Sequence, residues 1–546
     1  MLQSPAATGF GDWQMIHHNW EASYIAISRF GEWPLWDPFH CGGVPILGNP
    51  ESQLYAPWFW LSFAFGTVLA AKLMLLGHIA CATSGMYWLA RCRYQLHPGA
   101  AAVAAVAWSC NGCFVWDGAG GHATFLSFAF APWLSYFVHR NSNLLRDAAA
   151  VATFLILCLF EGGTYPLPFF ALWIGFELSL RAAQRKELCP SLGFGAISFG
   201  LLAVCGAIRF VPIYFTLQAH PRQVPNRDVL SFSDLWTMLT ARTHSWRMPG
   251  HPFVWPEYAS YVGVAVVTLA MLGAVAVVRR KRWHLLLASL VYAALMFGNL
   301  SDFAPYSLLH RLPVYDSLRV PSRFAIFVTF YIALLAAHSL DFCVRRIRNE
   351  RVVLTMSVVC VLGIGADLIS ASWPTVELWR EPPLSAAAPA PAFYLLPGKQ
   401  YASYASYPRL NVGTTNCYVG GMNWPISPAL WRGHEPQVRL PLDTGELHDW
   451  QSSPNGYRAR LTAREPTRVL FNRNFARGYE SNLGIPVDDQ GLLALDVPAG
   501  DHTITVHYSP PELIPSAAIS CIGLVVLLGL LLVPSDRLRL VATRRR

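Results

Sequence analysis

Carboxylates stand beside glycines deep in the apolar part of the chain. Asp117 precedes Gly118, and Glu161 precedes Gly162. A carboxylate at membrane depth is costly and usually faces a cavity or a partner, and a neighbouring glycine lets backbone approach a ligand. Asp117 and Glu161 are therefore candidates for a functional site, although Asp117 could equally do no more than begin its glycine-rich turn.

Two arginines add a second kind of chemistry. Arg319 and Arg323 are four residues apart at the predicted start of a helix, so they share one face of it. The guanidinium fork suits phosphate. A groove with carboxylates on one side and these arginines on the other could hold a phosphate-linked substrate and deprotonate an acceptor hydroxyl. The alternative is that both arginines are interfacial anchors that reach toward lipid headgroups.

The segment GDWQMIHHNWE near the N-terminus contains Asp12, Glu21 and a pair of histidines. Taken alone, Asp12 could cap a helix or be an ordinary surface acid. His17 and His18 are adjacent and diverge on a helix, so the pair does not predict a metal site. These residues require no cofactor, and a divalent metal held by Asp12 and Asp117 is left open.

The elements that must position these residues are membrane helices. Of 546 residues, 53% are hydrophobic and 13% charged, whereas a soluble domain carries roughly a quarter charged residues. Apolar runs that approach the length of a bilayer crossing predict about eleven spans in an all-α polytopic membrane protein. The runs are Gly66–Ala90, Ala100–Val115, His122–Val138, Ala148–Phe160, Tyr165–Leu180, Leu192–Tyr214, Tyr258–Val278, Trp283–Asn299, Val320–Leu340, Val352–Ser372 and Ala517–Val533.

Basic clusters fall at every second boundary between these runs. They are Arg91/Arg93, Arg140/Arg146, Arg181/Arg185/Lys186, Arg279–Arg282, Arg345/Arg346/Arg348/Arg351 and Arg537/Arg539/Arg544–Arg546. Basic residues near span ends mark the cytoplasmic side. The formal charge of +9 is therefore a topology signal rather than a nucleic-acid footprint, and the C-terminus is predicted inside.

The same alternation places the N-terminal segment outside, together with the turns that hold Asp117, His122, Glu161, Glu257 and the arginine pair. An outside N-terminus with no recognisable signal peptide has two explanations. Either a preceding helix is missing from this chain, which we expect, or the N-terminus is translocated without one. The polar residues of unusual type therefore collect on the outer face of the membrane.

Between residues 373 and 515 the hydropathy falls and turn residues return. After a linker at Arg380–Pro391, alternating or β-branched runs predict strands. These are Tyr457–Ala463, Arg468–Phe475, Leu492–Val497 and His502–Tyr508. We expect a small β-sandwich-like extracytoplasmic domain inserted before the last helix. The predicted organisation is a first outer loop (1–57), a helical core (58–372), the β-rich domain (373–515), and a last helix with a basic cytoplasmic tail (516–546).

Most of the twelve cysteines lie inside apolar runs, where cysteine behaves as a small hydrophobe. Cys110 and Cys113 form a C-x-x-C pair in such a run, which favours helix packing over metal or redox chemistry. Only Cys41 and Cys417 lie well outside the runs, so a disulfide between them is an open alternative.

Several motifs, in chain order, resemble those of the bacterial YfhO-like membrane proteins. They are Gly11-Asp12, Gly31-Glu32-Trp33-Pro34-Leu35-Trp36-Asp37-Pro38, Gly42-Gly43-Val44-Pro45, Glu257-Tyr258 with Tyr261-Val262-Gly263, Leu318-Arg319-Val320-Pro321-Ser322-Arg323-Phe324, and Val497-Pro498-Ala499-Gly500-Asp501-His502 before Tyr508-Ser509-Pro510. The resemblance covers almost the whole chain. Two departures are the absent first span and Gly478-Tyr479-Glu480 where the family has Gly-Trp.

That family looks like a branch of the GT-C glycosyltransferases, which take a sugar from a polyprenyl-phosphate donor on the outer face of the membrane. The resemblance implies a catalytic acid at Asp12 and a second acidic position at Asp117. The acceptor would be an envelope glycopolymer, a glycolipid or a protein, in contact with membrane lipid and without nucleic acid. The location implied is the bacterial cytoplasmic membrane.

The resulting hypothesis is an inverting transfer in which Asp12 deprotonates the acceptor. Arg319 and Arg323 would stabilise the departing phosphate. Further substrate-binding residues are expected to be Glu21, His122, Glu161 and Glu257. The alternatives from other classes are a transporter or flippase of a lipid-linked saccharide and a non-catalytic scaffold for envelope assembly.

Overall fold

The computed structural model describes residues 9, 11–140, 142–221, 228–243, 245–376, 384–397, 404–418 and 422–532. The basic tail predicted at the C-terminus (533–546) and residues 380–383 of the predicted linker lie outside the described residues. The helices and 3-10 turns are α1 (Trp13–Ser28), α2 (Pro57–Trp60), α3 (Ser62–Phe65), α4 (Thr67–Cys92), α5 (Pro98–Ser109), α6 (Gly112–Gly120), η1 (Ala123–Phe130), α7 (Ala131–His139), α8 (Leu144–Phe160), α9 (Pro166–Arg185), α10 (Leu188–Cys205), α11 (Ala207–Ala219), α12 (Phe232–Thr240), η2 (Trp255–Glu257), α13 (Val264–Arg279), α14 (His284–Met296), α15 (Pro305–Leu309), η3 (Tyr315–Ser317), η4 (Pro321–Phe324), α16 (Ala325–Val344), α17 (Glu350–Val376), η5 (Tyr404–Ser406), α18 (Tyr407–Leu410) and α19 (Leu513–Leu532).

Every predicted apolar run forms helix, but fewer than eleven helices have the length of a full span. In the described part of the chain, six are long and apolar enough to cross a membrane. They are Thr67–Cys92, Pro98–Gly120, Leu188–Cys205, Pro321–Val344, Glu350–Val376 and Leu513–Leu532. The span Pro98–Gly120 is itself made of two helices, α5 and α6. The Asn111 side chain accepts hydrogen bonds from the N–H groups of Cys113 and Phe114 and so starts α6 as a new helix after α5.

The helical body is built around α16. In the span Pro321–Val344, which contains α16, 83% of the apolar stretch is buried, whereas in α17 only 17% is buried. Helix α16 is therefore internal, and α17 presents its apolar side chains outward. Such a surface suits lipid as solvent. Helix α13 approaches α16 closely because Gly273 faces the Leu335 carbonyl, where a Cβ atom would lie only 1.9 Å from the oxygen. Close approach at small residues is typical of helix packing in membranes.

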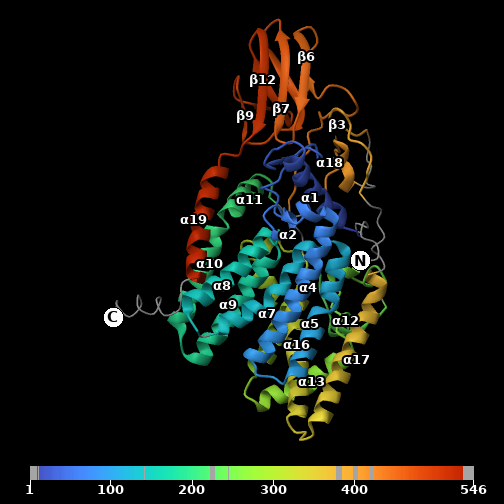
Figure 1. Ribbon diagram of the computed structural model, residues 1–546, viewed down its shortest axis with the longest axis vertical. Helices are drawn as coiled ribbons and strands as arrows, with labels where there is room; N and C mark the ends of the chain where they lie inside the picture. Colours follow the sequence, from blue (N-terminus) through green and yellow to red (C-terminus); the bar gives the residue numbers. More distant parts are fainter. Residues whose placement is uncertain are drawn as a thin grey trace, which may run out of the picture.

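A β-rich region stands at one end of the long axis (Figure 1). Its strands are β5 (Val438–Arg439), β6 (Gly445–Ser452), β7 (Gly456–Ala463), β8 (Thr467–Asn474), β9 (Tyr479–Ser481), β10 (Val487–Asp489), β11 (Leu492–Val497) and β12 (Gly500–Tyr508). They form two four-stranded antiparallel sheets, in the orders β10-β11-β8-β5 and β6-β7-β12-β9. Tyr457 of one sheet contacts Phe471 of the other at 5.3 Å between ring centroids. The four predicted strands are confirmed.

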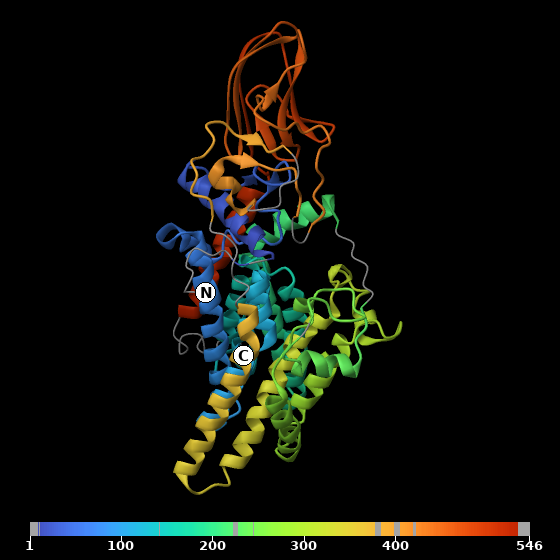
Figure 2. The same cartoon turned by 90° about the vertical axis from the view of Figure 1, so that its right-hand side faces the viewer.

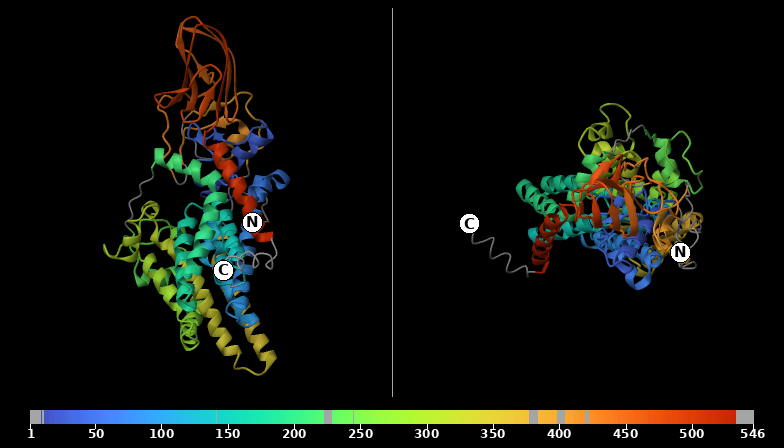
Figure 3. Two further views of the ribbon diagram at one scale, coloured as in Figure 1. Left: turned by 90° about the vertical axis from the view of Figure 1, so that its left-hand side faces the viewer. Right: turned by 90° about the horizontal axis from the view of Figure 1, so that it is seen from above.

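The N-terminal segment lies between the strands and the helices (Figure 2), and from above the strands lie over the helical body (Figure 3). The predicted loop contains a helix, α1. The irregular chain after α1 contains one short antiparallel pair, β1 (Trp36–Asp37) with β2 (Val44–Pro45). The chain before the β-rich region contains a short parallel pair, β3 (Tyr394–Leu395) with β4 (Val412–Gly413). Residues 34–50 are all buried. A disulfide between Cys41 and Cys417 ties this segment to the chain that precedes the β-rich region.

Candidate functional site

A cavity of about 340 Å³ opens where α1 starts, near the ends of several helices. Its wall combines residues that are far apart in the sequence. Those with polar side chains include Asp12, Glu51, His122, Glu257, Arg319, Arg323 and Tyr418, and Phe125 and Tyr165 contribute aromatic faces. Five of the sequence-predicted site residues therefore line one cavity, namely Asp12, His122, Glu257, Arg319 and Arg323. Asp117 does not line it but contacts His122, which does.

Asp12 occupies the position before the first turn of α1 but does not act as a helix cap. Its side chain makes no capping hydrogen bond. Instead, Oδ1 accepts a hydrogen bond from the Tyr418 hydroxyl at 3.1 Å, and Oδ2 lies 3.7 Å from Nε2 of His122. The side chain is 30% exposed, so it is neither buried nor an ordinary surface acid. Of the two alternatives to a functional role, the cap is excluded by this geometry.

The turn after α6 holds His122 against Asp12. The Asp12 N–H donates to the Gly120 carbonyl at 2.9 Å. Gly121 has a φ of +84°, and a Cβ atom there would lie 2.1 Å from the nitrogen of Trp13. Gly121 thus lets one backbone approach another rather than a ligand. Its lack of a side chain is what brings the imidazole to the carboxylate.

His122 lies between two carboxylates. Its Nδ1 is 3.2 Å from Oδ1 of Asp117, on the side opposite Asp12. Burial lowers the pKa of His122, but the hydrogen bond with Asp117 and the charges of Glu257, Asp117 and Asp12 outweigh burial and raise it to about 9. The imidazole is therefore a cation at neutral pH. A divalent metal bound by both Asp12 and Asp117 would have to displace this ring.

Arg323 and Glu257 form a two-pronged ion pair in the wall. Nε and Nη2 of Arg323 donate to the two carboxylate oxygens of Glu257 at 2.7 and 2.8 Å. The guanidinium also lies over the rings of Phe125 and Tyr165, at 4.5 and 4.9 Å from their centroids. Burial raises the pKa of Glu257, but Arg323, His122 and Arg319 outweigh it and lower the pKa. The buried Nη1 of Arg323 has no hydrogen-bond partner among the described residues.

Arg319 lines the same cavity, but it does not lie on the helix that the sequence predicted for it. It lies in the extended stretch before η4, whereas Arg323 lies within η4, so the two do not share the face of a regular helix. The expected helix-face geometry is wrong because Pro321 delays the start of the helix. The Arg319 guanidinium lies 5.8 Å from the centroid of Phe253, and its buried Nε has no hydrogen-bond partner among the described residues.

Glu161 does not line the cavity. Its carboxylate accepts hydrogen bonds from Trp58 Nε1 at 2.8 Å and Ser127 Oγ at 2.9 Å, and it pairs with His78 Nε2 at 3.0 Å. Gln53 donates to its carbonyl oxygen at 2.9 Å. A carboxylate near membrane depth is expected to face either a cavity or partners. Glu161 faces partners. Glu161 joins the first loop, α4, η1 and the end of α8.

Glu21 is also away from the cavity. Its side chain is fully buried within α1, and both oxygens accept hydrogen bonds from Arg409 of α18, at 2.6 and 2.8 Å. Thr67 at the start of α4 donates to the same carboxylate. Its contacts fasten α1 to two other elements and leave it no path to a substrate in the cavity.

The sequence did not single out Tyr418 and Glu51 as site residues. Tyr418 follows Cys417, and the disulfide to Cys41 is what delivers its hydroxyl to Asp12. The isolated cysteine pair was the one available signal. Comparison with known proteins adds nothing to this assignment, because neither a protein-family model nor a curated protein matches the chain.

Replacement of Gly121 by alanine should separate His122 from Asp12. The new Cβ collides with the start of α1 and the residue must keep a positive φ, so we expect a loss of at least about 2 kcal/mol of stability. Thermal unfolding of the purified protein in detergent measures it. Gly120→Ala is the matched control, since no atom lies within 4 Å of a Cβ there. Equal destabilisation by both substitutions would contradict the proposed contact.

The His122 pKa makes a prediction about pH. Its folded-state pKa of about 9 lies above the ordinary 6.5, so protonated His122 stabilises the fold. That contribution is complete below pH 6.5 and is lost as the pH rises through 9. It amounts to roughly 3 kcal/mol at most. Unfolding measured from pH 6 to 10 should show a steeper loss for the parent than for His122→Gln, and identical profiles would refute the assignment.

Proposed function

We propose that this chain is an integral-membrane glycosyltransferase of the GT-C type. It transfers a sugar from a polyprenyl-phosphate donor to an envelope acceptor on the outer face of the bacterial cytoplasmic membrane. The observation that supports the proposal most is the meeting of Asp12, His122, Arg319 and Arg323 in one cavity. A carboxylate that can take a proton thus lies beside cations that can hold a phosphate.

The chemistry assigned to this cavity is a single displacement at the anomeric carbon. Asp12 accepts the proton of the acceptor hydroxyl, whose oxygen forms the new bond to the sugar. The bond between the anomeric carbon and the phosphate oxygen breaks, and the electron pair leaves with the polyprenyl phosphate. The configuration at carbon inverts. Tyr418 orients the Asp12 carboxylate through Oδ1, while Oδ2 faces His122.

The arginines are assigned to the phosphate. The two hydrogen bonds to Glu257 hold the guanidinium of Arg323 at the cavity wall and leave its buried Nη1 without a partner among the described residues. In this proposal a small shift of the wall brings Nη1 to a phosphate oxygen while both bonds to Glu257 are kept. Glu257 therefore acts as an anchor of Arg323 rather than as a ligand of sugar hydroxyls. A preorganised donor of this kind stabilises charge that develops on the leaving group. Arg319 supplies a second positive charge from the adjacent wall.

The disulfide supports the proposed location of the cavity on the outer face of the membrane. Disulfides persist in oxidising compartments and are rare in the cytosol. Cys41 and Cys417 lie in the segment that carries Tyr418 to the cavity, so an outer location of the cavity is consistent with their pairing. The basic clusters at the opposite helix ends favour the same orientation.

The flippase alternative requires polar groups that line a path across the membrane. Two of the buried carboxylates away from the cavity are instead engaged by side chains of neighbouring helices. Glu161 pairs with His78, and Glu177 is bound by His139 at 2.5 Å and by the Tyr331 hydroxyl at 2.6 Å. This arrangement favours a site at one end of the helical body over a transport path.

Asp12→Asn tests the proposed base. The amide keeps the size of the side chain but cannot accept the proton, so turnover should fall roughly 10²–10⁴-fold while donor affinity changes little. A transfer assay with purified protein and a panel of polyprenyl-phosphate sugars measures turnover, and donor binding is measured separately. Glu51→Gln is the matched control, because it neutralises another carboxylate of the same wall. The assignment fails if Asp12→Asn stays folded, binds donor and retains the parent rate.

Arg323 should affect binding as well as turnover. Arg323→Lys keeps the charge but loses the fork, so it should retain only part of both quantities. Arg323→Ala should reduce turnover further, by roughly 10²–10³-fold. Because the alanine variant leaves Glu257 buried without its partner, it is compared with Arg323→Ala/Glu257→Gln, which restores charge balance. Parent-like donor affinity in the folded double variant would remove the phosphate role.

A further inference from the structure

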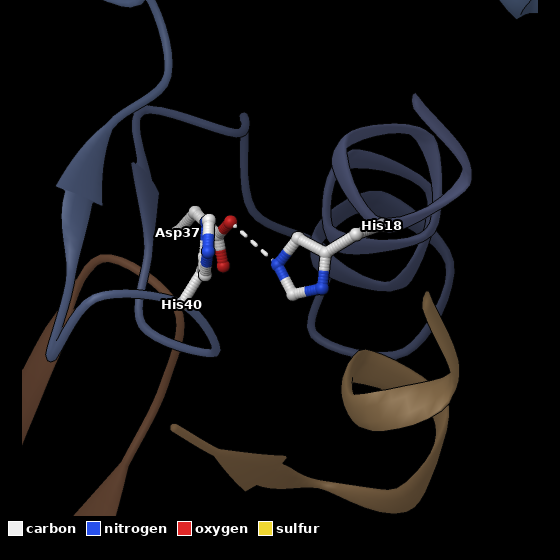
Figure 4. Close-up of side chains that lie close together, drawn as sticks. All are labelled: His18, Asp37 and His40. Carbon is white, nitrogen blue, oxygen red and sulfur yellow. Dashed lines mark hydrogen bonds and ion pairs between the residues drawn. The ribbon is translucent and has the colours of Figure 1, made fainter. Parts of the chain in front are cut away.

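A second cluster of polar side chains lies apart from the cavity, beside the disulfide. His18 of α1, Asp37 of β1 and His40 of the following turn converge there (Figure 4). Their potential ligand atoms all lie within 4.8 Å of one another. The three residues are between 0% and 3% exposed. Among the described residues this is the one place where three side chains of metal-binding type come so close.

The cluster already holds a carboxylate in a fixed orientation. Oδ2 of Asp37 lies 2.9 Å from Nε2 of His18, and Oδ1 accepts the N–H of Phe39 at 2.9 Å. Such second contacts orient a carboxylate for ligation. His40 lies beside Asp37 and, like it, faces His18 (Figure 4). Its Nε2 accepts the N–H of Tyr418 at 3.3 Å. That contact is long, so an ion can replace it at the cost of one weak hydrogen bond.

We propose that His18, Asp37 and His40 bind one divalent transition-metal ion, of which Zn²⁺ fits the ligands best. Two imidazoles and one carboxylate are donors that zinc accepts, whereas calcium and magnesium prefer oxygen ligands. Ligand atoms around a tetrahedral zinc lie roughly 3.4 Å apart, given bonds of about 2.1 Å. The widest pair must therefore close by small side-chain rotations, and a water molecule or another ligand completes the shell.

The burial of the three ligands supports this assignment. An ionised carboxylate away from water is costly without a compensating cation. A bound ion would supply that cation and join α1 to the irregular segment after it. The role is structural and does not depend on the proposed transfer activity.

The test uses the full chain in detergent, freed of tags and treated with chelator. Titration with Co²⁺, followed by its d–d absorption, should show one saturable equivalent per chain that Zn²⁺ displaces. Zn²⁺ should also raise the unfolding temperature. His18→Gln and His40→Gln should lose this equivalent. His78→Gln is the matched control, because His78 pairs with Glu161 in another buried site, to which the described part of the chain brings no third ligand of this type.

The proposal is overturned if the parent protein shows no saturable equivalent, or if the equivalent survives in both His18→Gln and His40→Gln. Should these variants not fold, X-ray absorption of the zinc-loaded parent decides the question. Two imidazoles and oxygen ligands in the first shell support the site. A shell with sulfur or with a single imidazole refutes it.

Discussion

The fold depends on burying an irregular stretch of backbone without leaving its polar groups unsatisfied. Residues 34–50 have almost no regular structure and are buried throughout. Each N–H and C=O removed from water needs a partner, and near a bilayer the cost of leaving one unpaired is several kcal/mol. The structure meets this requirement with side chains from distant elements rather than with a sheet.

Arg209 is the clearest example. Its guanidinium, buried in α11, donates to the carbonyls of Leu47 and Asn49 at 2.9 and 3.0 Å, and also to those of Pro50 and Ser52. From the opposite side, Asn455 and Asn474 of the β-rich region bond the backbone on either side of Asp37. The segment is thus held by helices below and strands above.

Sequence patterns predicted the apolar helices and the alternating strands, because both leave a regular pattern of hydrophobic residues in the sequence. The long apolar runs form helices, because a helix pairs the backbone groups of such a run within the run itself. The strand Leu492–Val497 appears at its predicted bounds. The polar edge strand β6 was missed because its side chains are exposed or only half-buried and carry little apolar pattern. Helix α1 was missed because its polar residues, Glu21 among them, face partners instead of water. The period of a buried polar helix does not show in hydropathy.

The candidate site was predictable only in part, for a related reason. Chemistry and topology placed Asp12, His122 and the arginines on one side, and the structure gathers them in one cavity. The same reasoning placed Glu161 and Glu21 there, although both are paired elsewhere. Nothing in a local sequence distinguishes a carboxylate that meets a partner from one that meets a cavity. Only the long-range contacts, such as that between Glu21 and Arg409, decide this.

That distinction also separates the two kinds of charged residue in this fold. Glu161 and Glu21 have both oxygens engaged by side chains of neighbouring elements and therefore hold these elements together. Around the cavity, Arg323 has one nitrogen without a partner in the described chain, and Asp12 is held by a hydroxyl and a longer ion pair beside open space. Buried donors that are incompletely satisfied are costly. Arg319 and Arg323 each have one such donor at the wall of this cavity. A charged ligand that completes their hydrogen bonds would offset this cost, which is the physical basis for proposing a function for this cavity.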